Sequence, residues 1–278
     1  MTLLTKTEIT KYLSVVSHLP ENERKKVFAL LEFDRVERCR ESFLFFVNQM
    51  WPIFIDGRHH KIMADAFERV ARHTKSEFAS YLLPAWFLGK FPEKKIIQTA
   101  HTAELAVGFG RKVRNLVLSE PYKKVFDTKL SSDSKAAGRW NTDKGGDYFA
   151  IGVGGAVTGK GADLLIIDDP HSEQEAKQGN PAVYDGVYEW YTSGPRQRLQ
   201  PGGAIIIVMT RWSKRDLTGQ IVKSSEKEGV NDWEVIEFPA IMPSGNPLWP
   251  AFWSQKELEA IKAEISVAKW EAQYQQNP

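Results

Sequence analysis

The sequence predicts an α/β protein with a mainly parallel sheet flanked by helices, preceded by a helical N-terminal segment. Three short, largely apolar runs over 95–100, 164–168 and 204–209 have the length and composition of buried strands. Stretches with apolar residues at helical spacing separate these runs. Strands that are buried on both faces and alternate with helices are typical of a parallel sheet covered on both sides.

The first fifty residues are expected to be helical. Pro20 is suited to open a helix at Glu21, and Trp51 followed by proline ends the apolar stretch. A second amphipathic stretch starts near His60. We therefore expect residues 1–58 to form a helical segment or subdomain of their own.

Strands and helices alternate from residue 95 onward. Thr102 is an expected N-cap for a helix that runs to Leu118. The remaining expected elements are a hairpin of 140–141 and 148–153, the strand 164–168, a helix over 183–198, the strand 204–209, a helix from Lys214, a strand over 233–238 and a helix opened by the capping box Ser254–Glu257. We expect residues 59–250 to form the core domain and 251–278 to form a C-terminal helical segment.

Composition excludes several classes of protein. Of the 278 residues, 42% are apolar and 26% are charged, which excludes a fibrous chain and a mostly disordered one. Cys39 is the single cysteine, so no internal disulfide can form and a reducing, intracellular setting is expected. The start of the sequence lacks a signal-peptide pattern, and no apolar run approaches the ~20 residues of a membrane-spanning helix.

Charge gathers in one segment of an almost neutral chain. The formal net charge is +2, which alone indicates no nucleic-acid partner. Residues 111–139, however, hold eight basic and three acidic side chains. Such a segment is suited to follow a phosphate backbone, and the alternative is an ordinary solvated helix face.

Two adjacent carboxylates follow the buried strand 164–168. Asp168 and Asp169 stand at its carboxyl end, where ligands bind in open parallel sheets. One carboxylate there can hold Mg²⁺ while its neighbour polarises an attacking water, as in a Walker B strand. The alternative is a strand that ends in a turn, because Asp-Asp-Pro also favours turns.

Two other sites have the residue types of phosphate chemistry. Lys75 and Ser76 begin a helical stretch, as the lysine and hydroxyl of a P-loop do. No glycine and no apolar strand precede them, so a solvent-facing pair within a helix is the alternative. Thr210 and Arg211 follow the strand 204–209, where a residue can sense a γ-phosphate; an ordinary strand end is the alternative.

The order of these three motifs is typical of a motor ATPase with extra strands in its sheet. The segments HTKSEFASYLLPAWFLGKFP, GGAVTGKGADLLIIDDPHSEQEA, AIIIVMTRWSKRDLTG and KWEAQYQQNP resemble the ATPase half of the large terminase subunit of tailed bacteriophages. The resemblance extends from about Phe43 to Pro278. It implies a P-loop NTPase-like fold of the ASCE type and an ATPase that pushes double-stranded DNA into a procapsid.

The resemblance also implies ligands, partners and a location. ATP and Mg²⁺ are the expected ligands. Double-stranded DNA, the portal protein and the small terminase subunit are the expected partners. Copies of the chain are expected to assemble as a ring on the portal, in the cytoplasm of the host cell, and to be monomeric in isolation.

Site roles follow from the resemblance residue by residue. Lys75 and Ser76 match the Walker A lysine and hydroxyl, and Asp168 with Ser76 matches the magnesium ligands. Asp169 takes the place of the catalytic carboxylate, and Thr210 with Arg211 falls in the motif that couples hydrolysis to movement. The remaining matches are Arg72 as the arginine of the variant loop, His73 and Thr74 beside the nucleotide, His60 with His59 near the adenine, and Arg139 or Arg111 as an arginine finger.

The sequence departs from the family pattern in two places. It stops at YQQNP, near the start of the family's linker to a nuclease domain, so we expect no DNA cleavage. The strand and turn that precede Arg72 in the family are absent, which removes the backbone cradle for phosphates. Two alternatives therefore stay open: a helicase-like DNA translocase, and a module that has lost nucleotide binding and only binds DNA or the portal.

Overall fold

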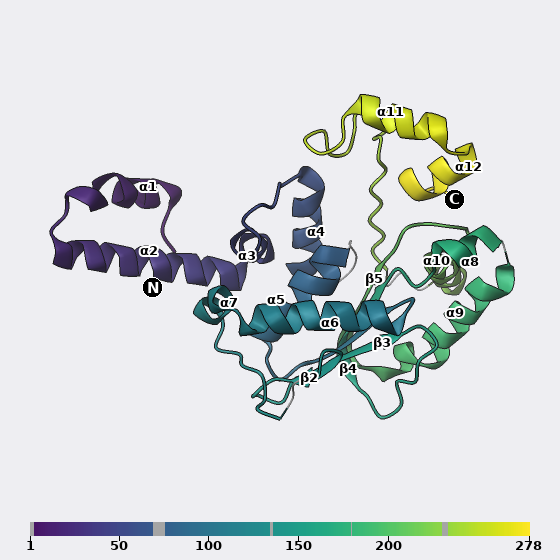
Figure 1. Cartoon of the computed structure of the whole chain (residues 1–278), viewed down its shortest axis with the longest axis horizontal. Coiled ribbons are helices and arrows are strands. Elements are labelled where there is room, and N and C mark those ends of the chain that lie inside the picture. Colours follow the sequence, from purple (N-terminus) through teal and green to yellow (C-terminus); the bar gives the residue numbers. More distant parts are fainter. Residues whose placement is uncertain (1–2, 69–75, 134–135, 179, 230–232) are drawn as a thin grey trace.

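Five strands form one sheet in the order β2-β3-β1-β4-β5 (Figure 1). The computed structural model describes residues 3–68, 76–133, 136–178, 180–229 and 233–278. Strands β1, β3, β4 and β5 are parallel, and β2 pairs antiparallel with β3 at one edge. The strands are β1 (Lys95–Ala100), β2 (Arg139–Asn141), β3 (Asp147–Gly152), β4 (Ala162–Asp168) and β5 (Leu199–Val208). The expected α/β class with a mostly parallel sheet is confirmed.

The register brings the carboxyl ends of the parallel strands to one edge. Ala100 of β1 pairs with Asp168 of β4, and Asp168 in turn pairs with Val208 of β5. Gly152 of β3 pairs with Ala100 on the other side. Any side chains that follow these four residues therefore meet along one edge of the sheet.

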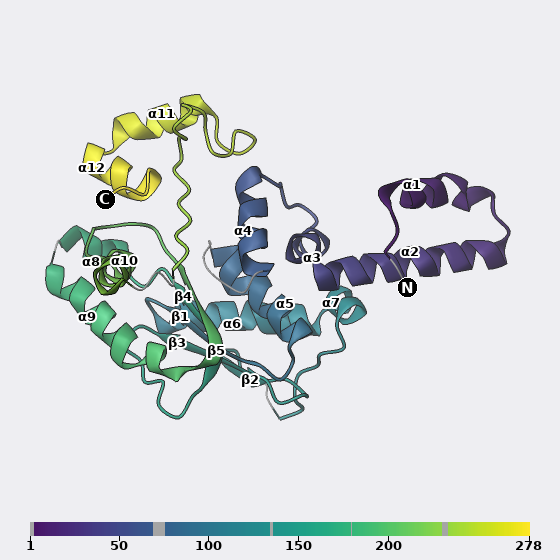
Figure 2. The same ribbon diagram turned by 180° about the vertical axis from the view of Figure 1, so that it is seen from behind.

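Two hydrophobic cores cover the two faces of the sheet (Figures 1 and 2). On one face, Ile96, Leu164 and Ile206 pack against the helices that precede and follow β1. On the other face, Leu165 and Ile207 pack against α9 and α10. The helices of the first face are α3 (Phe43–Met50), α4 (Arg58–Glu68), the π-helix η2 (Glu77–Leu82), α5 (Leu83–Lys90), α6 (Ala103–Leu118) and α7 (Glu120–Val125). Beyond the sheet's other face lie α8 (Glu173–Gln178), α9 (Pro181–Ser193), the 3₁₀ helix η3 (Pro195–Arg198) and α10 (Leu217–Glu228).

An N-terminal helix pair projects from the body of the molecule (Figure 1). It consists of α1 (Lys6–Val15), a 3₁₀ turn η1 (Val16–His18) and the long α2 (Glu21–Glu41). Helix α1 buries no residue, and α2 buries only Asp34 and Cys39. Asp34 ties the two ends of the pair together, because it accepts from the Leu4 amide at 2.6 Å and pairs with Arg38 at 2.7 Å.

The C-terminal segment lies beyond the carboxyl end of the sheet (Figure 2). It contains α11 (Gln255–Glu264), α12 (Val267–Lys269) and the π-helix η4 (Trp270–Tyr274). From residue 233 an extended chain leads up toward α11, and the Ala240 amide donates to the Tyr274 carbonyl at 2.7 Å. None of the helices in the described part of the chain is long and apolar enough to cross a bilayer.

Three expected elements differ from the structure. The expected strand 233–238 forms no ladder, and its residues run as extended chain. The helix expected over 183–198 ends at Ser193, because Gly194 and Pro195 interrupt it before a 3₁₀ turn. Strand β5 begins five residues earlier than expected, at Leu199, and its register against β4 is irregular between Leu199 and Ala204.

Candidate functional site

The hydroxyl of Ser76 meets the carboxylate of Asp168 at the carboxyl edge of the sheet. Ser76 Oγ donates to Asp168 Oδ1 at 2.6 Å, although 92 residues separate the two in sequence. Asp168 is the last residue of β4 and is 2% exposed. Ser76 stands directly before the π-helix η2, which lies against β4. Short π-helical turns are frequent at functional sites, and this one follows Ser76, the only described residue of the expected phosphate loop.

Burial and neighbouring charge both act on Asp168. Burial raises the pKa of Asp168 to about 6, with smaller contributions from the negative charges of Asp169 and Glu77. The hydrogen bond from Ser76 opposes this rise in the pKa. A carboxylate whose ionised form is disfavoured in this way gains most from a bound cation.

The donor set at this edge fits Mg²⁺. Asp168 and Ser76 offer a carboxylate and a hydroxyl oxygen, which are the hard ligands that Mg²⁺ prefers. Among the described residues, no three His, Cys, Asp or Glu side chains converge on one point. Mg²⁺ usually needs only one or two carboxylates, with water and substrate phosphates as the other ligands. The described residues therefore suit Mg²⁺ better than a metal that needs a full protein cage.

Asp169 links the ends of β4 and β5. Its backbone amide donates to the Val208 carbonyl at 2.7 Å, and its Oδ1 accepts from the Thr210 amide at 2.8 Å. Its φ is +40°, in the left-handed region that non-glycine residues seldom adopt. Strain of this kind concentrates at functional sites because the surrounding contacts must hold it in place. The structure thus brings Asp169 and Thr210 together.

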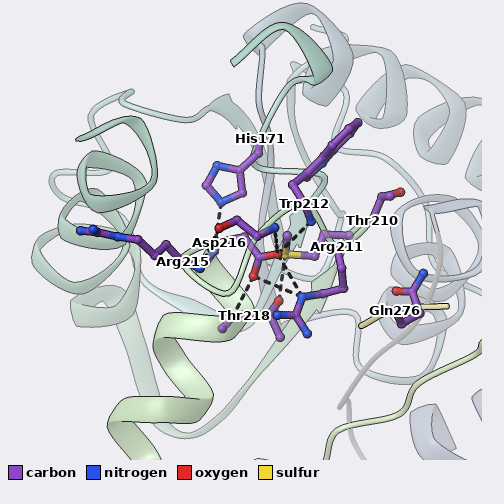
Figure 3. A network of polar contacts seen from close by, with 12 residues as sticks. His171, Thr210, Arg211, Trp212, Arg215, Asp216, Thr218 and Gln276 are labelled. Atoms are coloured by element: carbon purple, nitrogen blue, oxygen red, sulfur yellow. Dashed lines mark hydrogen bonds and ion pairs between the residues drawn. The ribbon is translucent and has the colours of Figure 1, made fainter. Parts of the chain in front are cut away.

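Arg211 is engaged by a buried carboxylate in the loop after β5 (Figure 3). Its Nε lies 3.0 Å from Asp216 Oδ2. Asp216 is fully buried and caps α10, because its side chain also accepts from the Gly219 amide at 2.9 Å and the Trp212 amide at 3.0 Å. In this structure the Arg211 guanidinium therefore holds the loop in shape.

His171 connects this loop to the one after β4 (Figure 3). Its Nε2 accepts from the Leu217 amide in the first turn of α10 at 3.0 Å. The ring also makes an edge-to-face contact with Tyr184, at 4.9 Å between centroids. Burial lowers the pKa of His171, which keeps the imidazole neutral and able to accept this bond. Sequence reasoning missed His171 and Asp216. Both closely follow an expected motif, and Asp216 also has the residue type of an N-cap.

The remaining expected phosphate-loop residues lie outside the described residues: Arg72, His73, Thr74 and Lys75. Within the described part of the chain, helix α4 stands before Ser76, and no strand precedes it there. The expected absence of a strand thus holds for residues 3–68.

His59 and His60 lie in the wall of an aromatic cavity that opens beside Ser76. The cavity has a volume of about 700 Å³, and its walls come from the loop between α3 and α4, from α4, from η2, from the chain that leads up to α11 and from the C-terminal segment. Both histidines are buried, and the His60 ring stacks on Phe78 at 5.1 Å between centroids. Trp249, in the chain before α11, lies edge-to-face against both histidines. Ligand sites of this kind combine apolar walls with a few polar groups.

The two candidate arginine fingers lie away from Asp168. Arg139 is exposed on the edge strand β2, which is three strands from β4, or roughly 14 Å. Arg111 is exposed on α6. Lys112 of the same segment pairs with Glu77, the residue after Ser76, with its Nζ 2.6 Å from Glu77 Oε1.

A solved structure shares this architecture. A crystal structure of the HK97 bacteriophage large terminase aligns with 86% of this chain and 55% of the terminase chain, at 15% sequence identity and a TM-score of 0.55. The chain has a terminase-like fold. It spans about half the length of that terminase. The sequence matches no family model and no curated protein.

Proposed function

We propose that this chain is the ATPase motor module of a terminase-like machine that moves double-stranded DNA. The observation on which the proposal rests is the contact between Ser76 and Asp168 at the carboxyl edge of the sheet. The terminase-like fold supports the same interpretation. The ligands ATP and Mg²⁺, and the portal and small-subunit partners, belong to this proposal.

The described residues divide the work of phosphoryl transfer to water. Asp168 and Ser76 would hold Mg²⁺, and the ion would supply positive charge against the phosphates of a bound nucleotide. Asp169, fixed by the Thr210 amide, orients the attacking water. Lys75 would contact the transferred phosphoryl group, and the aromatic cavity beside His60 takes the base.

The loop after β5 is suited to transmit the state of the site. Asp169 contacts Thr210, the next residue is held by Asp216, and Asp216 caps α10. His171 binds the same helix from the β4 side. A change at the phosphates can therefore reach α10 through two short routes.

The first prediction tests the metal and nucleotide roles directly. Asp168→Asn is expected to lower Mg-dependent ATP turnover by about 10²–10³-fold, because the charge that balances the cation is removed. Asp163→Asn is the matched control. Asp163 lies on the same strand as Asp168 but at the opposite end of that strand, where it pairs with Lys94. Turnover is measured by phosphate release, and nucleotide affinity by titration calorimetry beside Lys75→Ala.

Three outcomes separate the proposed motor from its alternatives. Equal turnover in Asp168→Asn and the parent chain contradicts the assignment of Asp168. DNA or portal binding without any nucleotide binding favours the module that has lost its P-loop, which the helix before Ser76 also favours. Unwinding of a forked duplex favours a helicase-like translocase.

A further inference from the structure

Three buried polar side chains cross the sheet diagonally on the face that packs against α6 and η2. Tyr148 of β3 is level with Ile96 of β1. Gln98 lies two residues further along β1, and Asp168 of β4 is level with Ala100, two residues further again. All three share a face with the apolar residues of the first core, so each polar side chain is the diagonal neighbour of the next.

Each member of this diagonal row leaves a polar atom without a partner among the described residues. Tyr148 and Gln98 are 0% exposed and Asp168 is 2% exposed. The atoms concerned are the Tyr148 hydroxyl, both amide atoms of Gln98 and Oδ2 of Asp168. Buried polar groups in folded proteins are almost always hydrogen-bonded, to protein or to ordered water. Four such atoms in one row therefore indicate a network rather than separate defects.

The chemistry of the three side chains matches their order in the row. The Tyr148 hydroxyl is a donor, and burial with a smaller effect of the Asp168 charge raises its pKa, so the phenol stays protonated. The Gln98 amide can accept on one atom and donate on the other, and Asp168 accepts. Diagonal neighbours on adjacent strands are ~7–8 Å apart, a span that long side chains or one bridging water can close. The Tyr148 ring is fixed by stacking on Trp140, at 4.9 Å between centroids.

We propose that Tyr148, Gln98 and Asp168 form one hydrogen-bonded row, completed by buried water, that holds Oδ2 of Asp168 and keeps Oδ1 turned toward Ser76. Gln98 and Tyr148 are positioning residues, since they act on the metal site only through Asp168. The metal part of this inference rests on the proposed function, whereas the row itself does not. Outer partners of this kind typically change metal affinity 10–100-fold when they are removed.

The first measurement tests the row without any metal. Tyr148→Phe removes one hydroxyl, and Gln98→Leu removes the amide at similar volume. In EDTA, each variant is expected to lower the Tm by about 2–4 °C, because a hydrogen bond is removed and its partner stays buried. The double variant is expected to lower the Tm by less than the two shifts together, since both changes break the same chain of bonds. The row is overturned if the single variants leave the Tm unchanged or raise it. It is also overturned if the Tm shift of the double variant equals the sum of the two single shifts.

The second measurement tests the positioning of Asp168. Mn²⁺ binding in the presence of saturating ADP is followed by electron paramagnetic resonance. Gln98→Leu is expected to weaken Mn²⁺ binding about 10-fold or more, and Tyr148→Phe by less. Thr99→Val is the matched control, because Thr99 is the next residue on β1, is equally buried, faces the other core and has a hydroxyl with no partner among the described residues. It is expected to leave Mn²⁺ affinity unchanged.

The possible failures are distinguishable. A lower Tm with Mn²⁺ affinity within twofold of the parent overturns the positioning role and leaves a purely structural network. A parent chain that binds no Mn²⁺ with ADP overturns the proposed function and the positioning role together, while the Tm series still decides whether the row exists. If Thr99→Val weakens Mn²⁺ binding as much as Gln98→Leu does, the positioning role is not specific to the row and is overturned.

Discussion

Asp168 combines deep burial with negative neighbours, and its ionised form is therefore unfavourable in the metal-free protein. Burial raises the pKa of Asp168 to about 6, from 3.8 in the unfolded chain. The folded state consequently binds a proton more tightly than the unfolded state does. The cost of ionisation is absent below about pH 4, grows up to about pH 6 and stays constant above it.

Removal of this charge should stabilise the protein. In EDTA at pH 8, Asp168→Asn is expected to increase the free energy of unfolding by roughly 3 kcal/mol, because an amide at this position never ionises. The gain should vanish near pH 4, where the parent carboxyl is protonated. Thermal unfolding between pH 4 and pH 8 measures it, and a gain that persists at pH 4 contradicts the stated cause. Asp163→Asn, which loses an ion pair with Lys94, should show no gain.

At the scale of single residues, the sequence indicated Ser76 and Asp168 because each has a recognisable local context. Asp168 ends an apolar run, and Ser76 follows a lysine at the start of a helical stretch. Gln98 and Tyr148 have no such context. Their importance comes from strand register, which places them beside Asp168 only after the sheet has formed. No pattern within one strand contains that information.

At the scale of elements, the first turn of α10 depends on one buried carboxylate. Asp216 accepts from two amides of the preceding loop and from the Gly219 amide, and it pairs with Arg211. The cap therefore stabilises a helix and a loop at once. Residue-level capping rules find Asp216 as an N-cap but do not reveal its second role.

Loss of Asp216 should cost far more than loss of an ordinary cap. Asp216→Ala is expected to lower the free energy of unfolding by about 3–5 kcal/mol, because the Arg211 charge stays partly buried without its partner. Ser254→Ala, which removes the cap of the exposed helix α11, should cost only about 1 kcal/mol. Urea denaturation of both variants provides the comparison. Equal costs for the two caps would contradict the role given to Arg211.

Elements with strong local sequence signals lie where they were expected. Whether the other segments form strands depends on the segments beside them in the fold. The Thr102 cap, the Ser254–Glu257 capping box and the strand Lys95–Ala100 are all confirmed. The segment 233–238 is rich in the β-branched and aromatic residues that strands favour, yet a strand also needs a paired neighbour. Composition alone does not provide that neighbour, and Val235 stays half exposed. This is why the expected strand is extended chain.

At the scale of the whole molecule, the described basic residues of 111–139 lie on α6, α7 and the edge strand β2 and in the chain between them. Some of these cations already have partners, such as Lys123 with Glu120 at 2.8 Å. The side chains of Lys124 and Arg139 are exposed. A surface of this kind is suited to contact phosphates of a duplex without reading its bases.

Neutralisation of this surface should weaken DNA binding in a salt-dependent way. Lys124→Ala combined with Arg139→Ala is expected to reduce the slope of log affinity against log salt by about 1 for each phosphate that the variant no longer neutralises. The control, Lys25→Ala with Lys26→Ala, removes two cations of the projecting helix α2 and should leave the slope unchanged. Fluorescence anisotropy with a random duplex at several salt concentrations measures both. An unchanged slope in the first variant would assign DNA binding to another face.

The contact between Ser76 and Asp168 has a consequence for folding during synthesis on the ribosome. A ribosome adds about 5–20 residues each second, so the 92 residues between the two side chains take about 5–20 s to make. Until β4 has been made, the helices of the first face lack the central strand against which they pack. During the same interval Ser76 has been made but its partner Asp168 has not. The site is therefore the product of long-range assembly, and a nascent chain halted before residue 168 has no nucleotide chemistry to perform.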